Sequence, residues 1–385
     1  MNMRLLWLTE NYPPRRGGMA QACDRIVDNL RKSGIEIDIA HFSQTTSSKV
    51  IQQQNGRLFN IPAIEGPGHS LNCFYNLISS SEYKTRYTHI VAFGGYLPIL
   101  ALPIFKCWLE ACAITLLRGN DFDLGIFSPS RRQILFDALD ASSVVSVLSS
   151  DQRQKLAHFI DEDKIFTIFN GIDCKDWHAD PTDMETAQSW RKENVEQQRK
   201  VVGLIGQLKA KKGGTFFLGN VLSANLEEKF HFLLIGDIAE EMAAWLEEKK
   251  DRLSYTRLEF LDRWELLSWY PACDFIALPS FYDGMPNVLL EAGALGIPVI
   301  AARAGGIPDV LGKDFSNFSF HPGDKHGCRA ALWNIANLDS EKRNEVGKLL
   351  KSRIESDFNS EKETEEYIRL LGKAHGSSQI GFMKT

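Results

Sequence analysis

Two carboxylates, Asp283 and Glu291, are the residues of this sequence whose types and spacing are best suited to chemistry. Asp283 stands in a polar turn with Gly284, and Glu291 follows after seven residues, about two helical turns further on. The start of a helix between them would suit a phosphate, because its first N–H groups have no partner within the helix. A carboxylate nearby would suit the paired hydroxyls of a sugar. Together these features indicate a nucleotide-sugar site; the alternative is a capping Asp and a solvated Glu on an ordinary helix.

The elements that must position these acids are a strand, a helix and a second strand. An apolar run over residues 275–278 predicts a buried strand, and apolar residues at helical spacing predict a helix after Asp283. Pro286 suits the first helical position, where the missing N–H needs no partner. Gly296 ends the helix, and residues 298–301 predict the next strand. The stretch is therefore a predicted βαβ unit whose helix begins at a ligand site.

Residues 278–311 resemble the donor-site motif of retaining glycosyltransferases of family 4, the glycosyl transferases group 1. That family has an acid, seven residues and a Glu, then Gly-x-Pro-Val-Ile-Ala and Gly-Gly; the matching positions here are Asp283, Glu291, residues 296–301 and residues 305–306. The resemblance implies that Asp283 contributes to catalysis and holds the donor sugar, and that Glu291 holds the ribose hydroxyls. The remaining donor contacts implied in this stretch are Gly284, Met285, Pro286, Asn287, Val288 and Leu289. The family's first acid is usually Glu; the shorter Asp283 keeps the charge but moves the carboxylate inward.

A second motif follows a predicted strand at residues 201–205. The family has Gly-Arg-Leu, three residues and Lys-Gly; this chain has Gln207 in place of the Arg and keeps Lys212 and Gly213. The resemblance implies that Gln207 and Lys212 contact the donor diphosphate and that Lys212 neutralises the charge of the leaving group. From the residues alone, three lysines on a solvated loop are the simpler interpretation.

The N-terminal part begins with a predicted strand, a glycine loop and a helix, but Gly17 and Gly18 do not form the G-x-G-x-x-G dinucleotide fingerprint. In the resembling family this loop approaches the donor diphosphate and the acceptor, so Gly17 and Gly18 are predicted backbone contacts; the alternative is a plain turn. Arg118 stands where the family commonly has a His in the acceptor site. We expect Arg118 to be an anion clamp in catalysis or a structural partner of Asp121.

A D-x-D triplet, Asp121-Phe122-Asp123, is the remaining candidate for metal binding. D-x-D is the metal motif of the other large glycosyltransferase fold, but such triplets are common by chance, and residues 161–163 form a similar acidic run. Helix capping before Leu124 is the simpler account. We therefore expect no metal and no cofactor.

The length of 385 residues predicts two domains. Residues 1–175, joined by a C-terminal helix at about 358–385, are expected to form a Rossmann-like acceptor domain, and residues 176–357 a Rossmann-like donor domain. The fold class is α/β, and the resemblance implies the GT-B arrangement, with two parallel sheets facing each other across a cleft. Residues 42–67 are expected to be irregular, residues 258–261 to form a strand, and the tail from His375 to be loose.

Composition limits the partners and the location. A net charge of −5, with 18 Lys plus Arg against 17 Asp plus Glu up to residue 175, gives no reason to expect nucleic acid. Seven scattered cysteines without a C-x-x-C pair indicate a reducing cytosol and argue against a disulfide framework or a zinc site. Residues 96–117 are interrupted by charges and prolines, so a helix followed by a strand is expected there rather than a membrane span. We expect a cytoplasmic protein, and peripheral contact with the inner membrane face stays open.

The predicted function is transfer of a sugar from a UDP- or GDP-sugar to a hydroxyl of a glycan, a lipid-linked glycan or glycolipid, or a small glycoside. The resemblance implies a retaining, metal-independent hexosyltransferase of polysaccharide biosynthesis. One alternative is a GT-B epimerase or phosphorylase, although those families lack the acid-x7-Glu and Gly-Gly unit. The other is a non-catalytic protein that binds nucleotide sugars or glycans, to which the departures at Asp283, Gln207 and Arg118 point.

Overall fold

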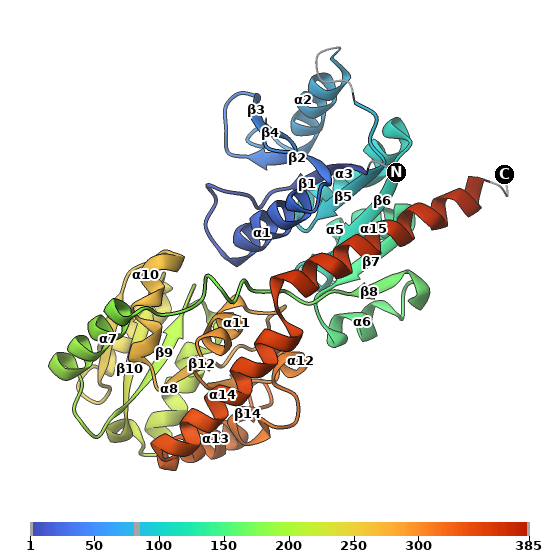
Figure 1. The fold of residues 1–385 in the computed structure, drawn as a ribbon. Helices are drawn as coiled ribbons and strands as arrows, with labels where there is room; N and C mark the ends of the chain where they lie inside the picture. Colours follow the sequence, from blue (N-terminus) through green and yellow to red (C-terminus); the bar gives the residue numbers. More distant parts are fainter. Residues whose placement is uncertain (1–2, 81–84, 120, 383–385) are drawn as a thin grey trace. The chain divides into compact units, whose positions relative to one another are not determined.

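The computed structural model describes residues 3–80, 85–119 and 121–382, with side chains described up to residue 375. The chain divides into two compact units: unit 1 is Met1–Phe169 with Ser360–Thr385, and unit 2 is Asn170–Asn359. Each unit contains one sheet flanked by helices (Figure 1). Both are therefore α/β units, and the last helix of the chain belongs to the first of them.

The sheet of unit 1 has eight strands in the order β3-β4-β2-β1-β5-β6-β7-β8. Every pair is parallel except β3 with β4. Its central strands are buried on both faces, as expected for a parallel sheet covered by helices. The strands are β1 Arg4–Thr9, β2 Glu36–Ser43, β3 Lys49–Gln53, β4 Gly56–Pro62, β5 His89–Phe93, β6 Cys112–Leu116, β7 Val144–Val147 and β8 Ile165–Thr167.

Helices cover both faces of this sheet, so neighbouring residues of one strand enter different cores. Trp7 of β1 packs in a core that includes Leu30 and Tyr367, whereas Leu8 packs in a second core with Phe74 and Phe105. The helices of unit 1 are α1 Gly18–Lys32, α2 Pro67–Ser79, α3 Tyr96–Leu109, α4 Asp121–Ile126, α5 Pro129–Ala141, α6 Ser150–Leu156, the 3₁₀ turn η1 Glu162–Lys164, and α15 Ser360–Phe382.

The sheet of unit 2 has six parallel strands in the order β11-β10-β9-β12-β13-β14. In the unit's own numbering this order is 3-2-1-4-5-6, the doubly wound Rossmann order, which reverses direction between β9 and β12. The strands are β9 Lys200–Ile205, β10 Phe230–Ile235, β11 Tyr255–Leu258, β12 Phe275–Leu278, β13 Val299–Ala302 and β14 Ser319–Phe320.

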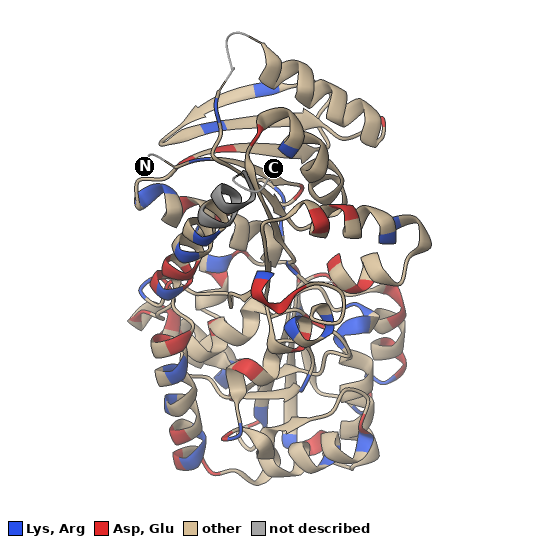
Figure 2. Ribbon diagram, turned by 90° about the vertical axis from the view of Figure 1, so that its right-hand side faces the viewer, with Lys and Arg blue, Asp and Glu red and all other residues tan. Residues whose placement is uncertain are grey.

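The helices of unit 2 alternate with its strands. They are α7 Pro181–Asn194, α8 Gly214–Ser223, α9 Glu240–Glu248, α10 Arg263–Leu267, α11 Asn287–Ala294, α12 Ile307–Leu311, α13 Lys325–Asn337 and α14 Ser340–Asp357, with the 3₁₀ turns η2 Ala210–Lys212, η3 Glu227–Lys229, η4 Tyr270–Ala272 and η5 Ser316–Phe318. Figure 2 shows acidic and basic residues interspersed along α14. Among the described residues, no helix combines the length and the hydropathy that a membrane span requires.

The structure corrects four local expectations. Residues 42–67 are not irregular: they contain β3 and β4, joined at Asn55-Gly56, both with positive φ. The Asn-Gly pair was a hairpin signal that the polarity of β3 obscured. A strand is expected at residues 258–261, but the observed strand, β11, covers Tyr255–Leu258. It is a partly polar edge strand, so a search for apolar runs does not detect it.

The other two corrections concern helix ends. Pro286 is the N-cap of α11 rather than its first residue. The tail expected to be loose from His375 is helical as far as Phe382, in α15, and residues 383–385 lie outside the described residues. The strand expected at Phe275–Leu278 is confirmed residue for residue, since it is short, apolar and fully buried.

Candidate functional site

Two loops of unit 2 lie side by side at the point where the strand order reverses. One loop follows β9 and the other follows β12, and doubly wound sheets bind ligands outside the carboxyl ends of such strands. The backbone N–H of Phe281 donates to the carbonyl of Lys211 at 2.9 Å. A Cβ on Gly213 would lie 2.1 Å from the carbonyl oxygen of Pro279, so only glycine permits this approach.

An ion pair joins these two loops. The Nζ of Lys212 donates to Oδ2 of Asp283 at 2.5 Å. Ser280 also contacts Oδ2, at 3.3 Å, and the N–H of Gly284 donates to Oδ1 at 3.1 Å. The side chains of Lys212 and Asp283 are 29% and 15% exposed. The two predicted charges, 71 positions apart in the sequence, therefore meet in a partly solvated pair.

The glycine pair that follows β13, Gly305-Gly306, packs against the backbone of the loop that carries Asp283. Gly305 has φ +52°, and a Cβ there would lie 1.8 Å from the carbonyl oxygen of Asp283. The N–H of Gly306 donates to the carbonyl of Gly284 at 2.5 Å. The Gly-Gly part of the motif thus fixes the backbone that carries Asp283.

Asn170 fixes the start of α11 and was not among the predicted site residues. Its Nδ2 donates to the carbonyl of Met285 at 3.1 Å and to Oδ1 of Asn287 at 3.4 Å, and the side chain is buried. Of the predicted donor segment, Gly284, Met285, Pro286 and Leu289 are buried, and Asn287 and Val288 are half-buried. The helix start is therefore rigidly packed. The Asn-Gly-x-Asp turn was the sequence signal that could have identified Asn170.

Glu291 points into the interior of unit 2. It is 7% exposed, and the hydroxyl of Tyr270 donates to its Oε2 at 2.6 Å. Burial, followed by the charge of Glu291 and the hydrogen bond to it, raises the pKa of Tyr270 well above its ordinary value. Trp177 packs edge-on against the Tyr270 ring. Glu291 is therefore not the solvated helix residue of the alternative interpretation, and no sequence pattern pointed to Tyr270.

The other polar residues of the loop after β9 are more exposed to solvent than Lys212. Gln207 and Lys209 are exposed, whereas the neighbouring Leu208 is buried, with its N–H donating to the carbonyl of Asp237. Burial lowers the pKa of Lys211, and the nearby charge of Lys212 lowers it further. Gln207 thus stands at the surface of the loop that carries Lys212.

The remaining predicted residues belong to unit 1. The strand order of this sheet also changes direction at β1, whose following loop leads to Gly17 and Gly18. Gly17 has φ +117° and is the N-cap of α1, where its carbonyl accepts from Ala20 and Gln21. The contact of Gly17 and Gly18 with a diphosphate stays a prediction.

Arg118 is buried, at 4% exposure, in the same unit. Its Nη1 donates to the hydroxyl of Tyr367 at 2.6 Å, and its guanidinium lies over the ring of Phe93. Its backbone N–H, rather than its guanidinium, contacts Oδ2 of Asp121 at 2.9 Å. The catalytic role of Arg118 stays a prediction, and its observed contacts are internal.

The D-x-D triplet has structural contacts. Oδ1 of Asp121 accepts from the N–H of Gly95 at 2.9 Å, so Asp121 joins the turn before α3 to the loop after β6. Asp123 lies 3.8 Å from the Nζ of Lys155. Asp121 is the first residue of α4 and not the cap before it. Its side chain instead binds the N–H of Gly95, at the start of α3.

Comparison with known proteins shows which family this part of the chain resembles. Residues 199–337 match the family model described as glycosyl transferases group 1. The D-inositol 3-phosphate glycosyltransferase of Corynebacterium glutamicum is 25% identical over 369 residues, covering 86% of each chain. Over residues 199–337 the chain is therefore similar to the glycosyl transferases of group 1. It is also similar to the N-acetyl-alpha-D-glucosaminyl L-malate synthase of Bacillus anthracis, at 24% identity over 66% of each chain.

Solved structures identify the fold of this chain as GT-B. The sucrose-phosphate synthase of Thermosynechococcus elongatus superposes with a TM-score of 0.78 at 17% identity, covering 100% of both chains. Anabaena HepE in complex with UDP-glucose superposes with a TM-score of 0.72 at 17% identity, covering 96% of this chain and all of that chain. The predicted fold class and the predicted resemblance to this family are confirmed.

Proposed function

We propose that this glycosyltransferase moves a sugar from a UDP- or GDP-sugar to a hydroxyl of a glycan, a lipid-linked glycan or a small glycoside, with retention and without a metal. The observation that carries the proposal is the Lys212–Asp283 pair at the start of α11. A cation, a helix N-terminus and a carboxylate are the groups that a diphosphate linked to a sugar requires.

Lys212 and the first N–H groups of α11 would stabilise the departing diphosphate. Cleavage of the sugar–phosphate bond places negative charge on the leaving group, and a preorganised cation acts most strongly where charge develops. Lys212 would exchange Asp283 for phosphate oxygens when the donor binds. Asp283 and the backbone from Gly284 onward would then hold the sugar hydroxyls, and Glu291 the ribose.

The proposed reaction needs no protein base. The bond from the anomeric carbon to the diphosphate oxygen breaks, and a bond from that carbon to the acceptor oxygen forms on the same face. The acceptor proton goes to an oxygen of the leaving diphosphate. The absence of the family's His at Arg118 is compatible with this route. The solved structure of HepE with UDP-glucose supports a uridine donor.

A donor screen tests the proposal. Purified protein is mixed with UDP-, GDP- and ADP-sugars, and each mixture is assayed for thermal stabilisation and for slow hydrolysis of the donor. We expect one nucleotide sugar to stabilise and to release its sugar, and Glu291→Ala to abolish the stabilisation. Asp123→Ala in unit 1 is the control and should leave both signals intact.

The outcomes separate the alternatives. Stabilisation together with sugar release supports the proposal. Stabilisation without turnover, with acceptors supplied, would favour a nucleotide-sugar-binding protein. Turnover lost in EDTA and restored by manganese would contradict the metal-free mechanism. Wild-type behaviour of Glu291→Ala would remove the ribose role of Glu291.

A further inference from the structure

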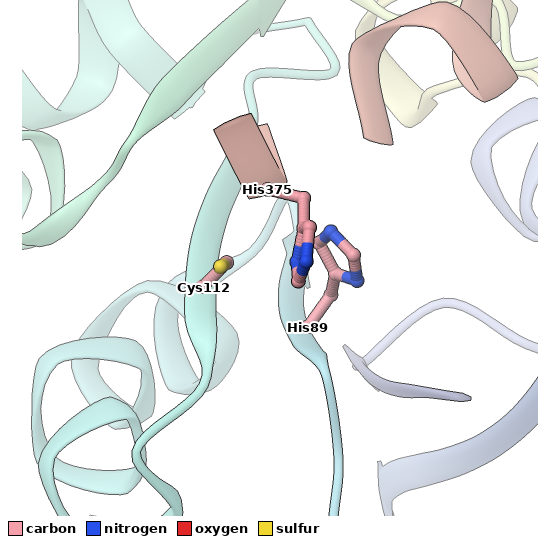
Figure 3. A group of neighbouring side chains, drawn as sticks. All are labelled: His89, Cys112 and His375. Carbon is pink, nitrogen blue, oxygen red and sulfur yellow. The ribbon is translucent and has the colours of Figure 1, made fainter. Parts of the chain in front are cut away.

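Three metal-binding side chains converge in unit 1, at the sheet edge opposite to the loops that bear Gly17 and Arg118. His89 begins β5, Cys112 begins β6, and His375 lies on α15 (Figure 3). One ligand atom of each residue lies within 4.8 Å of the other two. His89 and Cys112 are register partners on adjacent strands, and the rings of His89 and His375 are 5.8 Å apart.

The surroundings of His89 can serve a metal ligand. Its Nε2 is the nitrogen on the α15 side, 3.1 Å from the carbonyl of Leu371, one helical turn before His375. Its Nδ1 lies 2.9 Å from the hydroxyl of Thr88, which is also 3.0 Å from the carbonyl of Arg4. With a cation on Nε2, Nδ1–H would donate to Thr88, and the Thr88 hydroxyl would donate to Arg4. A partner that fixes the second ring nitrogen in this way is typical of metal-binding histidines.

The ligand set indicates the class of metal. Two imidazoles and a thiolate suit zinc and similar borderline-soft cations, whereas magnesium and calcium require oxygen ligands. His89 is fully buried, and Cys112 and His375 are half-buried. Such a site would have three protein ligands and a fourth position for water.

We propose that His89, Cys112 and His375 form a zinc-type site that fastens α15 to the sheet of unit 1. On binding, the cation replaces the Leu371 carbonyl at Nε2 of His89, and the ring proton moves to Nδ1. Cys112 loses its thiol proton to solvent and binds as the thiolate. The three ligands come from positions 89, 112 and 375, which explains why no local cysteine spacing announces the site.

The test uses the full chain with Co²⁺ as a spectroscopic probe, followed by Zn²⁺. Wild type should gain a thiolate-to-cobalt charge-transfer band, Cys112→Ser should lose it, and His375→Gln should weaken it together with the visible d–d bands. Zn²⁺ at about 100 times its Kd should raise the Tm of the wild type by about 5–10 °C, because it binds only the folded state.

Cys73→Ser is the matched control. Cys73 lies on α2 with its Sγ 3.3 Å from Nε2 of His69. The substitution Cys73→Ser therefore removes a different thiol that also lies beside a histidine. This variant should keep the band and the Tm rise. The proposal is overturned by a missing band in wild type, by a band that persists in Cys112→Ser, or by a band lost in Cys73→Ser. If Cys112→Ser does not fold, an undiminished band in His375→Gln overturns it instead.

Discussion

A buried tyrosine holds a charged side chain in each unit, and the two pairs differ in direction. In unit 1 the hydroxyl of Tyr367 accepts from Arg118 at 2.6 Å, whereas in unit 2 the hydroxyl of Tyr270 donates to Glu291 at 2.6 Å. Arg118 is thereby joined to α15, a packing element, and Glu291 stands on α11, whose N-terminal side carries Asp283. The role of a charged side chain is therefore not determined by its position after a strand or on a helix. It is determined by the residue that the side chain binds.

Glu10 of unit 1 and Asp283 of unit 2 also differ in the groups that bind their carboxylates. In unit 1 the carboxylate of Glu10 accepts from the N–H groups of Tyr96 and Leu97, at the start of α3. In unit 2 Asp283 accepts from the one N–H of Gly284, and its other oxygen is bound by the side chain of Lys212, which can turn to another anion. A carboxylate held by backbone N–H groups is a fixed part of the structure, whereas one held by a lysine can exchange its partner with a ligand.

The largest effect is expected from Lys212→Ala. Because charge grows on the leaving group in the transition state, kcat should fall by about 10²–10³-fold, with a smaller change in donor KM. Steady-state kinetics with the donor found in the screen measures this. Lys209→Ala, which removes an exposed lysine of the same loop, should stay near wild type. An equal loss in both variants would mean that only the overall charge of the loop matters.

Arg118→Met decides whether the comparison between the units is correct. The change leaves the buried Tyr367 hydroxyl without this donor, so the free energy of unfolding should fall by about 1–3 kcal/mol. The kcat of the folded protein should change little. Arg25→Met is the control, because Arg25 also binds α15, through Glu363. A large loss of kcat in Arg118→Met alone, at matched stability, would support the predicted catalytic role of Arg118.

Tyr270→Phe tests the unit 2 pair. The ring against Trp177 is kept, but Glu291 loses one hydrogen bond, so the donor KM should rise by about 5–10-fold, the equivalent of about 1 kcal/mol. Kinetics at saturating acceptor measures the change. Tyr367→Phe in unit 1 should leave the KM unaltered. If Tyr270→Phe lowers stability while the KM stays at the wild-type value, Tyr270 only packs and does not orient Glu291.

The smallest effect concerns alkaline pH. Burial, the main cause, raises the pKa of Tyr367 to about 12, so the folded state keeps a proton that the unfolded state loses near pH 10. This contribution to stability is complete below about pH 10 and is lost as the pH rises towards 12, by at most about 1.4 kcal/mol per pH unit. Denaturant unfolding at pH 9 and pH 11 should show a shallower decline for Tyr367→Phe than for wild type. An equal loss of unfolding free energy in Tyr367→Phe and wild type would contradict this contribution of Tyr367.

The sequence predicted local features better than contacts. The strand at Phe275–Leu278 and the start of α11 depend on short-range apolar spacing and turn residues, and both were found within one residue. The pairing of Lys212 with Asp283 depends on the reversal of strand order between β9 and β12, which no local pattern encodes. The family resemblance supplied both residues without supplying their contact.

Long-range packing was the part that could not be predicted. Arg118 and Tyr367 are 249 positions apart, so nothing near Arg118 could indicate that its charge is buried beneath α15. Tyr270 stands in a short 3₁₀ turn without a motif. The hairpin at Asn55-Gly56 differs from these cases, because its signal is local and was outweighed by the polar composition of the segment.

The assignment of α15 to unit 1 has a consequence for synthesis. Residues 1–169 leave the ribosome first, yet one core of that unit needs Tyr367, Leu370, Leu371 and Ala374 from the last helix. Trp7 and Leu30, which line that core, have no cover from α15 while unit 2 is being translated. The first unit to be made is therefore the last to be completed, and a chain that stops at residue 359 can finish only the second.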